Sequence, residues 1–117
     1  MKKELFNFDL LFSNSGGDID FIEQMMFLFI ENTPLQVQRI KQGLADKSYD
    51  EIRFASHKLL SSVEILKAES LIGLVREIEK LAFEKQNFIV IASKTGLLEK
   101  NLTIVIQEMK QLDFRNL

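Results

Sequence analysis

The chain has a single histidine, His57, and no cysteine. The imidazole of His57 is therefore the side chain best suited to act as a nucleophile or to exchange a proton near neutral pH. The residues around His57 predict an amphipathic helix with an apolar stripe, at about 100° of rotation per residue. His57 lies about 160° from the centre of that stripe, so we expect its ring to stand in water on a rigid support. A neutral imidazole placed there can attack an activated phosphoryl group through one nitrogen while the other nitrogen keeps its proton. The stripe consists of Ile52, Ala55, Leu59, Val63 and Leu66.

Two neighbours of His57 suit such a transfer. Ser61, one turn further on, is small, so the active site of another protein could reach the ring. Lys58 lies about 100° round the helix, but its long cationic side chain could approach a phosphate. Two other interpretations stay open, which are a surface histidine without a role and a small hydrolase that uses His57 with Ser61. The hydrolase needs an oxyanion hole, and the helix already uses the N–H groups near Ser61.

Composition and motifs exclude several other functions. With one histidine and no cysteine, a zinc site would need several converging carboxylates, so we expect no metal and no bound cofactor. No glycine-rich nucleotide loop is present, which argues against an autokinase. A net charge of −2 and a pI near 5.4 argue against nucleic acid as a partner. The apolar run 21–30 is too short to cross a bilayer, so we expect no membrane contact and a cytoplasmic location.

The elements that position His57 should be long helices, because one proline and five glycines leave little material for turns. Apolar residues recur at helical spacing in every long segment, and no segment makes a convincing strand. The predicted fold is therefore all-α, an antiparallel four-helix bundle with a short N-terminal helix or arm. We expect one domain over 1–117, with the arm and a loop at 1–17 and the bundle at 18–113. The expected helices cover about 18–32, 34–46, 48–66, 67–84 and 88–112.

Local signals mark most of these helix ends. Asp18 can cap the first long helix, and Ser48 has capping-box spacing to Glu51 at the start of the histidine helix. Pro34 suits the first position of a helix. Either a new helix begins at Pro34 or one long helix kinks there.

The stretch 55–68 reads Ala-Ser-His-Lys-Leu-Leu-Ser-Ser-Val-Glu-Ile-Leu-Lys-Ala. It resembles the phosphoacceptor motif of histidine-containing phosphotransfer (HPt) domains, roughly A-H-x-L-K-G-S-S-x-x-[LIF]-G-A. The resemblance extends to 21–34, 44–46 and 71–81, and it implies a four-helix bundle with the active histidine exposed midway along one helix. The positions that match in register are His57, Leu59, Ser62, Leu66 and Ala68.

Three positions depart from the family motif. The family lysine three places after the histidine is Leu60, the glycine after it is Ser61, and the later glycine is Lys67. The lysine normally lies near the phosphoryl group, so Lys58 is the cation that could compensate. Members of the family often have a Gln or Glu on the next helix that bonds the histidine ring, which makes Glu79 the candidate for that support.

The resemblance implies a phosphorelay intermediate. His57 would accept a phosphoryl group from the phospho-aspartate of one receiver domain and pass it to the aspartate of another. The expected partners are response-regulator receiver domains, with a hybrid histidine kinase as a further expected partner. The receiver would supply Mg²⁺, and this domain would have no turnover of its own. The alternative is a helical adaptor without phosphotransfer that binds a receiver or kinase domain through its apolar face.

The segment 18–32 is apolar around nearly its whole circumference, which is more than one buried stripe requires. The N-terminal arm could cover the surplus. The surplus could instead form an apolar patch beside His57 that receives a receiver domain. In that interpretation the docking residues are Phe54, Leu60, Met26 and Phe29.

Overall fold

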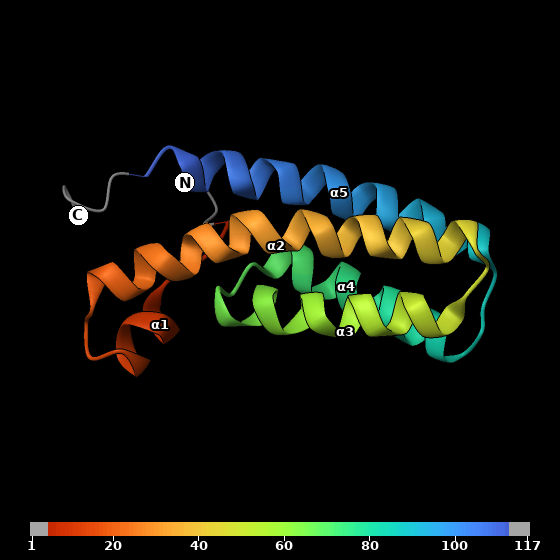
Figure 1. Cartoon of the computed structure of the whole chain (residues 1–117), viewed down its shortest axis with the longest axis horizontal. Coiled ribbons are helices and arrows are strands. Elements are labelled where there is room, and N and C mark those ends of the chain that lie inside the picture. The colour runs from red at the N-terminus through yellow and green to blue at the C-terminus, as the bar shows by residue number, and fades with distance from the viewer. Residues whose placement is uncertain (1–4, 113–117) are drawn as a thin grey trace.

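The computed structural model describes residues 5–112, and within that range the chain forms five helices and no strand (Figure 1). The all-helical prediction is confirmed. Residues 1–4 of the predicted arm and residue 113, where the predicted bundle ends, lie outside the described residues. The helices are α1 (Asp9–Asn14), α2 (Ile19–Ala45), α3 (Tyr49–Ile65), α4 (Glu69–Phe83) and α5 (Phe88–Lys110).

The four long helices run in alternating directions along one axis (Figure 1). Helix α2 packs against α3 and α5, and α4 packs against the same two helices. Each long helix therefore has two neighbours and turns one apolar face inward. His57 lies on the outer face of α3, with α2 on one side and α4 on the other.

Polar side chains begin three of the long helices. Asp18, Ser48 and Asn87 accept hydrogen bonds from backbone N–H groups of the first turn at 3.1, 3.2 and 2.8 Å. These bonds satisfy donors that have no partner inside the helix. The predictions of Asp18 and Ser48 as caps are confirmed, and the predicted break at Gln86-Asn87 lies directly before α5.

A lysine in the left-handed region ends each of α2, α3 and α4. Lys47, Lys67 and Lys85 have φ values of 53°, 49° and 53°. After Lys67, the N–H of Ala68 donates to the carbonyl of Val63 at 3.0 Å, which is the long bond of a Schellman motif. Glycine is the usual residue at such a position, so the family glycine that Lys67 replaces has a structural reason.

Helix α2 continues through Pro34 without a break. Of the two alternatives, a new helix at Pro34 is therefore wrong and one long helix is right, while the kink at Pro34 stays a prediction. Proline lacks the N–H that would bond the preceding turn. In that turn the buried hydroxyl of Thr33 donates to the carbonyl of Phe29 at 2.6 Å.

Helix α1 covers only part of the apolar surplus on α2. Leu11 is buried, and the N–H of Asn7 donates to the carbonyl of Leu66 at 2.6 Å, which ties the arm to the end of α3. Phe27 and Leu28 on α2 stay exposed. No helix within residues 5–112 has the length and apolar character that crossing a membrane would require.

Candidate functional site

The imidazole of His57 stands in solvent, with 73% of its side chain exposed. Its support is rigid because the opposite face of α3 is anchored in the core by Ala55 and Leu59, both fully buried. The buried hydroxyl of Ser56, next to His57, bonds back to the carbonyl of Ile52 at 2.7 Å and leaves no unpaired polar group there. The ring therefore projects from a helix that has little freedom to move.

One nitrogen of the ring has a fixed partner. Nδ1 of His57 lies 3.1 Å from Oε1 of Glu79, which is half-buried on α4. An ionised carboxylate only accepts hydrogen bonds, so Nδ1 carries the proton and donates it. The contact between Glu79 and the ring is the one that the resemblance implied.

The other nitrogen is left with its lone pair. Nε2 of His57 makes no hydrogen bond to any residue within 5–112. A neutral imidazole in this tautomer is a nucleophile at Nε2. The site can thus form a bond to an electrophile that a second molecule brings to the surface.

A shallow hollow surrounds His57 and Glu79 and is completed by Asp50, Arg53 and Phe54. Two of these five side chains are carboxylates, and Arg53 supplies the one cation. Lys58, the cation expected to assist, is not part of this lining, and its Nζ lies 4.9 Å from the centre of the Phe54 ring, which is. The sequence places Arg53 one turn before His57 on the same face, but no role was predicted for it.

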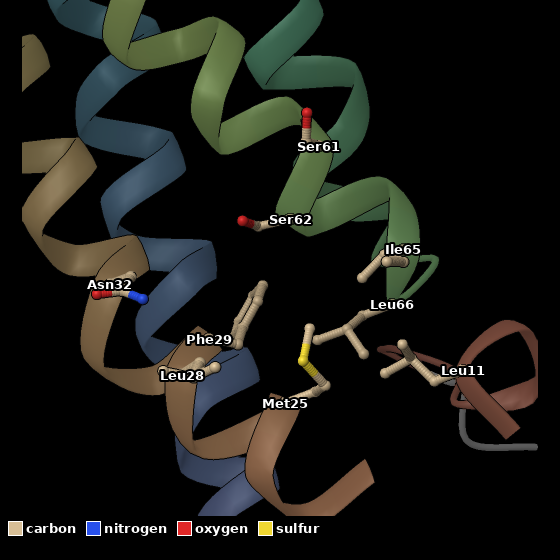
Figure 2. A pocket seen from close by; sticks show the side chains of 9 residues that line it. All are labelled: Leu11, Met25, Leu28, Phe29, Asn32, Ser61, Ser62, Ile65 and Leu66. Atoms are coloured by element: carbon tan, nitrogen blue, oxygen red, sulfur yellow. The ribbon is translucent and has the colours of Figure 1, made fainter. Parts of the chain in front are cut away.

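The residues that follow His57 face in two directions. Leu60 is half-buried and packs against the core, so it adds little to an outer surface. Ser61 is exposed, and Ser62 beside it points toward a second pocket (Figure 2). Phe54 is exposed, in agreement with a docking role.

The second pocket lies between α1, α2 and α3 and has a volume of about 280 Å³ (Figure 2). Its wall is mostly apolar, and it begins one turn beyond His57, at Ser61. Leu28, 44% exposed, forms part of the rim. The lining residues are Leu11, Met25, Leu28, Phe29, Asn32, Ser61, Ser62, Ile65 and Leu66.

Two expected docking residues lie in the core instead. Met26 and Phe29 are 4% and 5% exposed, because they fall on the inward stripe of α2 with Ile22, Val37 and Ile40. A partner cannot reach Met26, and it meets Phe29 only as an inner wall of the pocket. Of the five large apolar residues that stay exposed on α2, three recur at every seventh position, which is one face of a helix. They are Phe21, Leu28 and Leu35.

These features define a helical protein that presents one nucleophilic imidazole on its surface beside an apolar pocket. The family model described as the Hpt domain matches residues 24–112, and the chain belongs to this family. The resemblance seen in the sequence is thereby confirmed, and membership supports a role in phosphorelay in general.

A solved structure has a similar fold. It is the HPT domain from the Hpt Sensor Hybrid Histidine Kinase from Shewanella, with a TM-score of 0.76 over 92% of each chain and 20% sequence identity. At this identity the likeness concerns the fold. No curated protein matches the chain.

Proposed function

We propose that this chain is a phosphorelay intermediate, in which His57 accepts a phosphoryl group from a receiver phospho-aspartate and passes it to another receiver aspartate. One observation supports this most directly: the exposed ring has Nδ1 held by Glu79 at 3.1 Å and Nε2 open to solvent. A nucleophile for a bulky protein-bound donor needs this combination of access and fixed orientation.

The transfer balances without any further reactant. The lone pair of Nε2 forms a bond to phosphorus, the bond from phosphorus to the aspartyl oxygen breaks, and the aspartate leaves as a carboxylate. The proton on Nδ1 stays in place, so the ring becomes a phosphorylated imidazolium. The carboxylate of Glu79 faces that positive charge and stabilises it. The reverse sequence of bonds passes the group on to a second aspartate.

This chain supplies the nucleophile, and the receiver supplies the rest of the chemistry. By the family resemblance, Mg²⁺ belongs to the receiver, where it neutralises phosphoryl oxygens during transfer. In this proposal the antiparallel four-helix bundle acts in the cytoplasm as a carrier and binds no Mg²⁺ of its own. Without a partner, the domain has no catalytic cycle.

The apolar pocket between α1, α2 and α3 is the surface that we assign to receiver docking. It begins one turn from His57, so a receiver bound there brings its own active site over the ring. Leu28 lines the pocket and is exposed, Leu35 two turns further along α2 adds exposed apolar area, and Phe54 lines the hollow with His57. An apolar patch with a polar, reactive centre is typical of a transient protein interface.

The experiment is a transfer assay with receiver domains encoded in the same genome, each charged with radiolabelled acetyl phosphate. Wild-type chain should acquire label that is labile in acid and stable in alkali, and His57→Gln should acquire none. The ring is exposed, so this substitution should leave the thermal unfolding midpoint unchanged. A receiver that forms a stable complex with no transfer of label would identify an adaptor and refute the relay. Failure of every receiver to label or to bind would refute both functions.

A further inference from the structure

Helices α3 and α4 pair in an antiparallel register beside the candidate site. His57 faces Glu79, and one turn away Arg53 faces Phe83, with its guanidinium carbon 4.7 Å from the ring centre. Arg53 and His57 are one turn apart on α3, and Glu79 and Phe83 are one turn apart on α4. The two contacts between the helices therefore lie side by side. Arg53 and His57 are about 40° apart around α3 and line the same hollow.

The charge of Arg53 is not committed to a carboxylate. Within residues 5–112, Arg53 makes no ion pair, and its recorded partner is the aromatic face of Phe83. Arg76 on the same side of the molecule is different, because it is bound to Glu64 at 2.9 Å. Asp50 shares the hollow with Arg53, but the two form no ion pair. Arg53 therefore has its N–H donors available for a ligand.

The hollow also needs a cation if His57 carries a phosphoryl group. Asp50 and Glu79 place two carboxylates around the ring, and both repel phosphoryl oxygens. The lysine that the family has at position 60 is absent, and Leu60 packs against the core. Lys58 projects about 100° away from His57; its Nζ lies over the ring of Phe54, and unlike Arg53 it does not itself line the hollow.

We propose that Arg53 is the cation that binds the phosphoryl group on Nε2 of His57, in place of the lysine absent at position 60. This inference rests on the proposed function and names a further residue of the same site. Residues one turn apart have Cβ atoms about 5–6 Å apart, which an arginine spans easily. The planar guanidinium can donate two parallel hydrogen bonds to phosphoryl oxygens. Phe83 positions Arg53, because its ring holds the guanidinium beside the hollow before any phosphoryl group arrives.

The test uses phosphoramidate, a small donor that phosphorylates histidine without a protein partner, so that docking does not enter. Labelling rate and the lifetime of the phosphohistidine are measured on the whole chain. Arg53→Gln should lower the labelling rate about fivefold to tenfold, in line with the loss of charge-assisted hydrogen bonds at an exposed site. Arg53→Lys should keep part of the wild-type labelling rate, since lysine retains the positive charge but cannot donate two parallel hydrogen bonds as a guanidinium does. Lys58→Gln is the matched control and should stay within about twofold of wild type.

A rescue separates binding of the phosphoryl group from a structural effect. Arg53→Gln combined with Leu60→Lys restores a cation from the other side of His57, with the lysine stem lying along apolar surface. This double variant should recover most of the lost rate, whereas a merely structural role of Arg53 predicts no recovery. Phe83→Ala should lower the rate about twofold to threefold while Arg53 is still present.

The outcomes of these assays distinguish a failure of the role of Arg53 from a failure of the proposed phosphorelay function on which it rests. Wild type that is labelled at His57, with Arg53→Gln equally fast and equally long-lived, overturns the role of Arg53 and leaves the relay intact. A loss confined to Lys58→Gln assigns the role to Lys58 and also overturns the inference. Wild type that neither phosphoramidate nor any charged receiver labels overturns the relay itself.

Discussion

The contact between His57 and Glu79 allows the sharpest prediction, because substitution can separate the charge of the carboxylate from its hydrogen bond. Glu79→Gln keeps an oxygen that can accept from Nδ1 and removes the negative charge. Glu79→Ala removes both. Glu64→Gln is the matched control, since Glu64 is another glutamate that bridges α3 and α4, through Arg76 at 2.9 Å.

The size of the charge effect follows from the geometry. Nδ1 and Oε1 are 3.1 Å apart, and the ring is 73% exposed, so the water value of the dielectric constant applies. For charge centres about 4 Å apart in water, the attraction is about 1 kcal/mol. Glu79→Gln should therefore lower the equilibrium yield of phosphohistidine about fivefold. Glu79→Ala should lower it about threefold more, because the net worth of an exposed hydrogen bond is at the low end of the usual range.

The assay combines labelling with a direct view of the ring. Because the chain has one histidine, its imidazole gives the only histidine signals in a nitrogen–proton correlation spectrum. Wild type should show the proton on Nδ1, and Glu79→Ala should lose that preference. Labelling with phosphoramidate then reports the yield for each variant. A wild-type spectrum with the proton on Nε2, or a Glu79→Ala variant labelled as well as wild type, would refute the reasoning.

Four further substitutions test the packing of the helices and the proposed docking surface. Lys67→Gly should stabilise the chain by about 0.5–1 kcal/mol, since it removes a side chain from a left-handed position with φ of 49°; urea unfolding that shows a loss would contradict this. Gly43→Ala should destabilise it by about 1–3 kcal/mol, because the new Cβ would lie 2.9 Å from Cγ1 of Ile52. Gly96→Ala, with nothing within 4 Å, should instead stabilise it by about 0.5–1 kcal/mol, and equal effects of the two alanines would refute the packing argument. Leu28→Asp should slow transfer from a receiver at least about tenfold and leave phosphoramidate labelling unchanged, whereas loss of both would show a fold defect rather than a docking defect.

The helix boundaries were predictable because the chain marks them with local chemistry. Asp18 and Ser48 cap helices through bonds that span three residues, and such bonds depend little on the rest of the fold. The exposure of His57 was predictable for the same reason, since it follows from the apolar stripe on its own helix. Glu79 was found only through the family resemblance, because the register between two helices is not written in either one.

The wrong assignment of Met26 and Phe29 on α2 as docking residues has a physical cause. An expected helix end at Pro34 left a short segment, 18–32, that is apolar on every side and has no preferred inward face. Treated as one helix through Pro34, the segment acquires a long stripe that extends to Val37 and Ile40, and Met26 and Phe29 fall on it. The exposed apolar stripe that we propose for docking is then the one that contains Leu28 and Leu35.

The sequence places Arg53 one turn before His57, but it does not show that the ring of Phe83, on another helix, holds the guanidinium there. Core residues and site residues lie on opposite faces of α3, which explains how the cation of the site can sit at a different position from the family lysine. The inward face of α3 is filled by Ala55 and Leu59, while His57 and Arg53 stand on the outward face and contribute little to packing. Substitution on the outward face therefore costs the fold almost nothing. A cation lost at position 60, where Leu60 now adds to the core, can be replaced one turn before the histidine with no change in the helices that hold the ring. This reasoning requires that Arg53→Gln lose activity without losing stability, so a variant that unfolds at a clearly lower temperature would count against it.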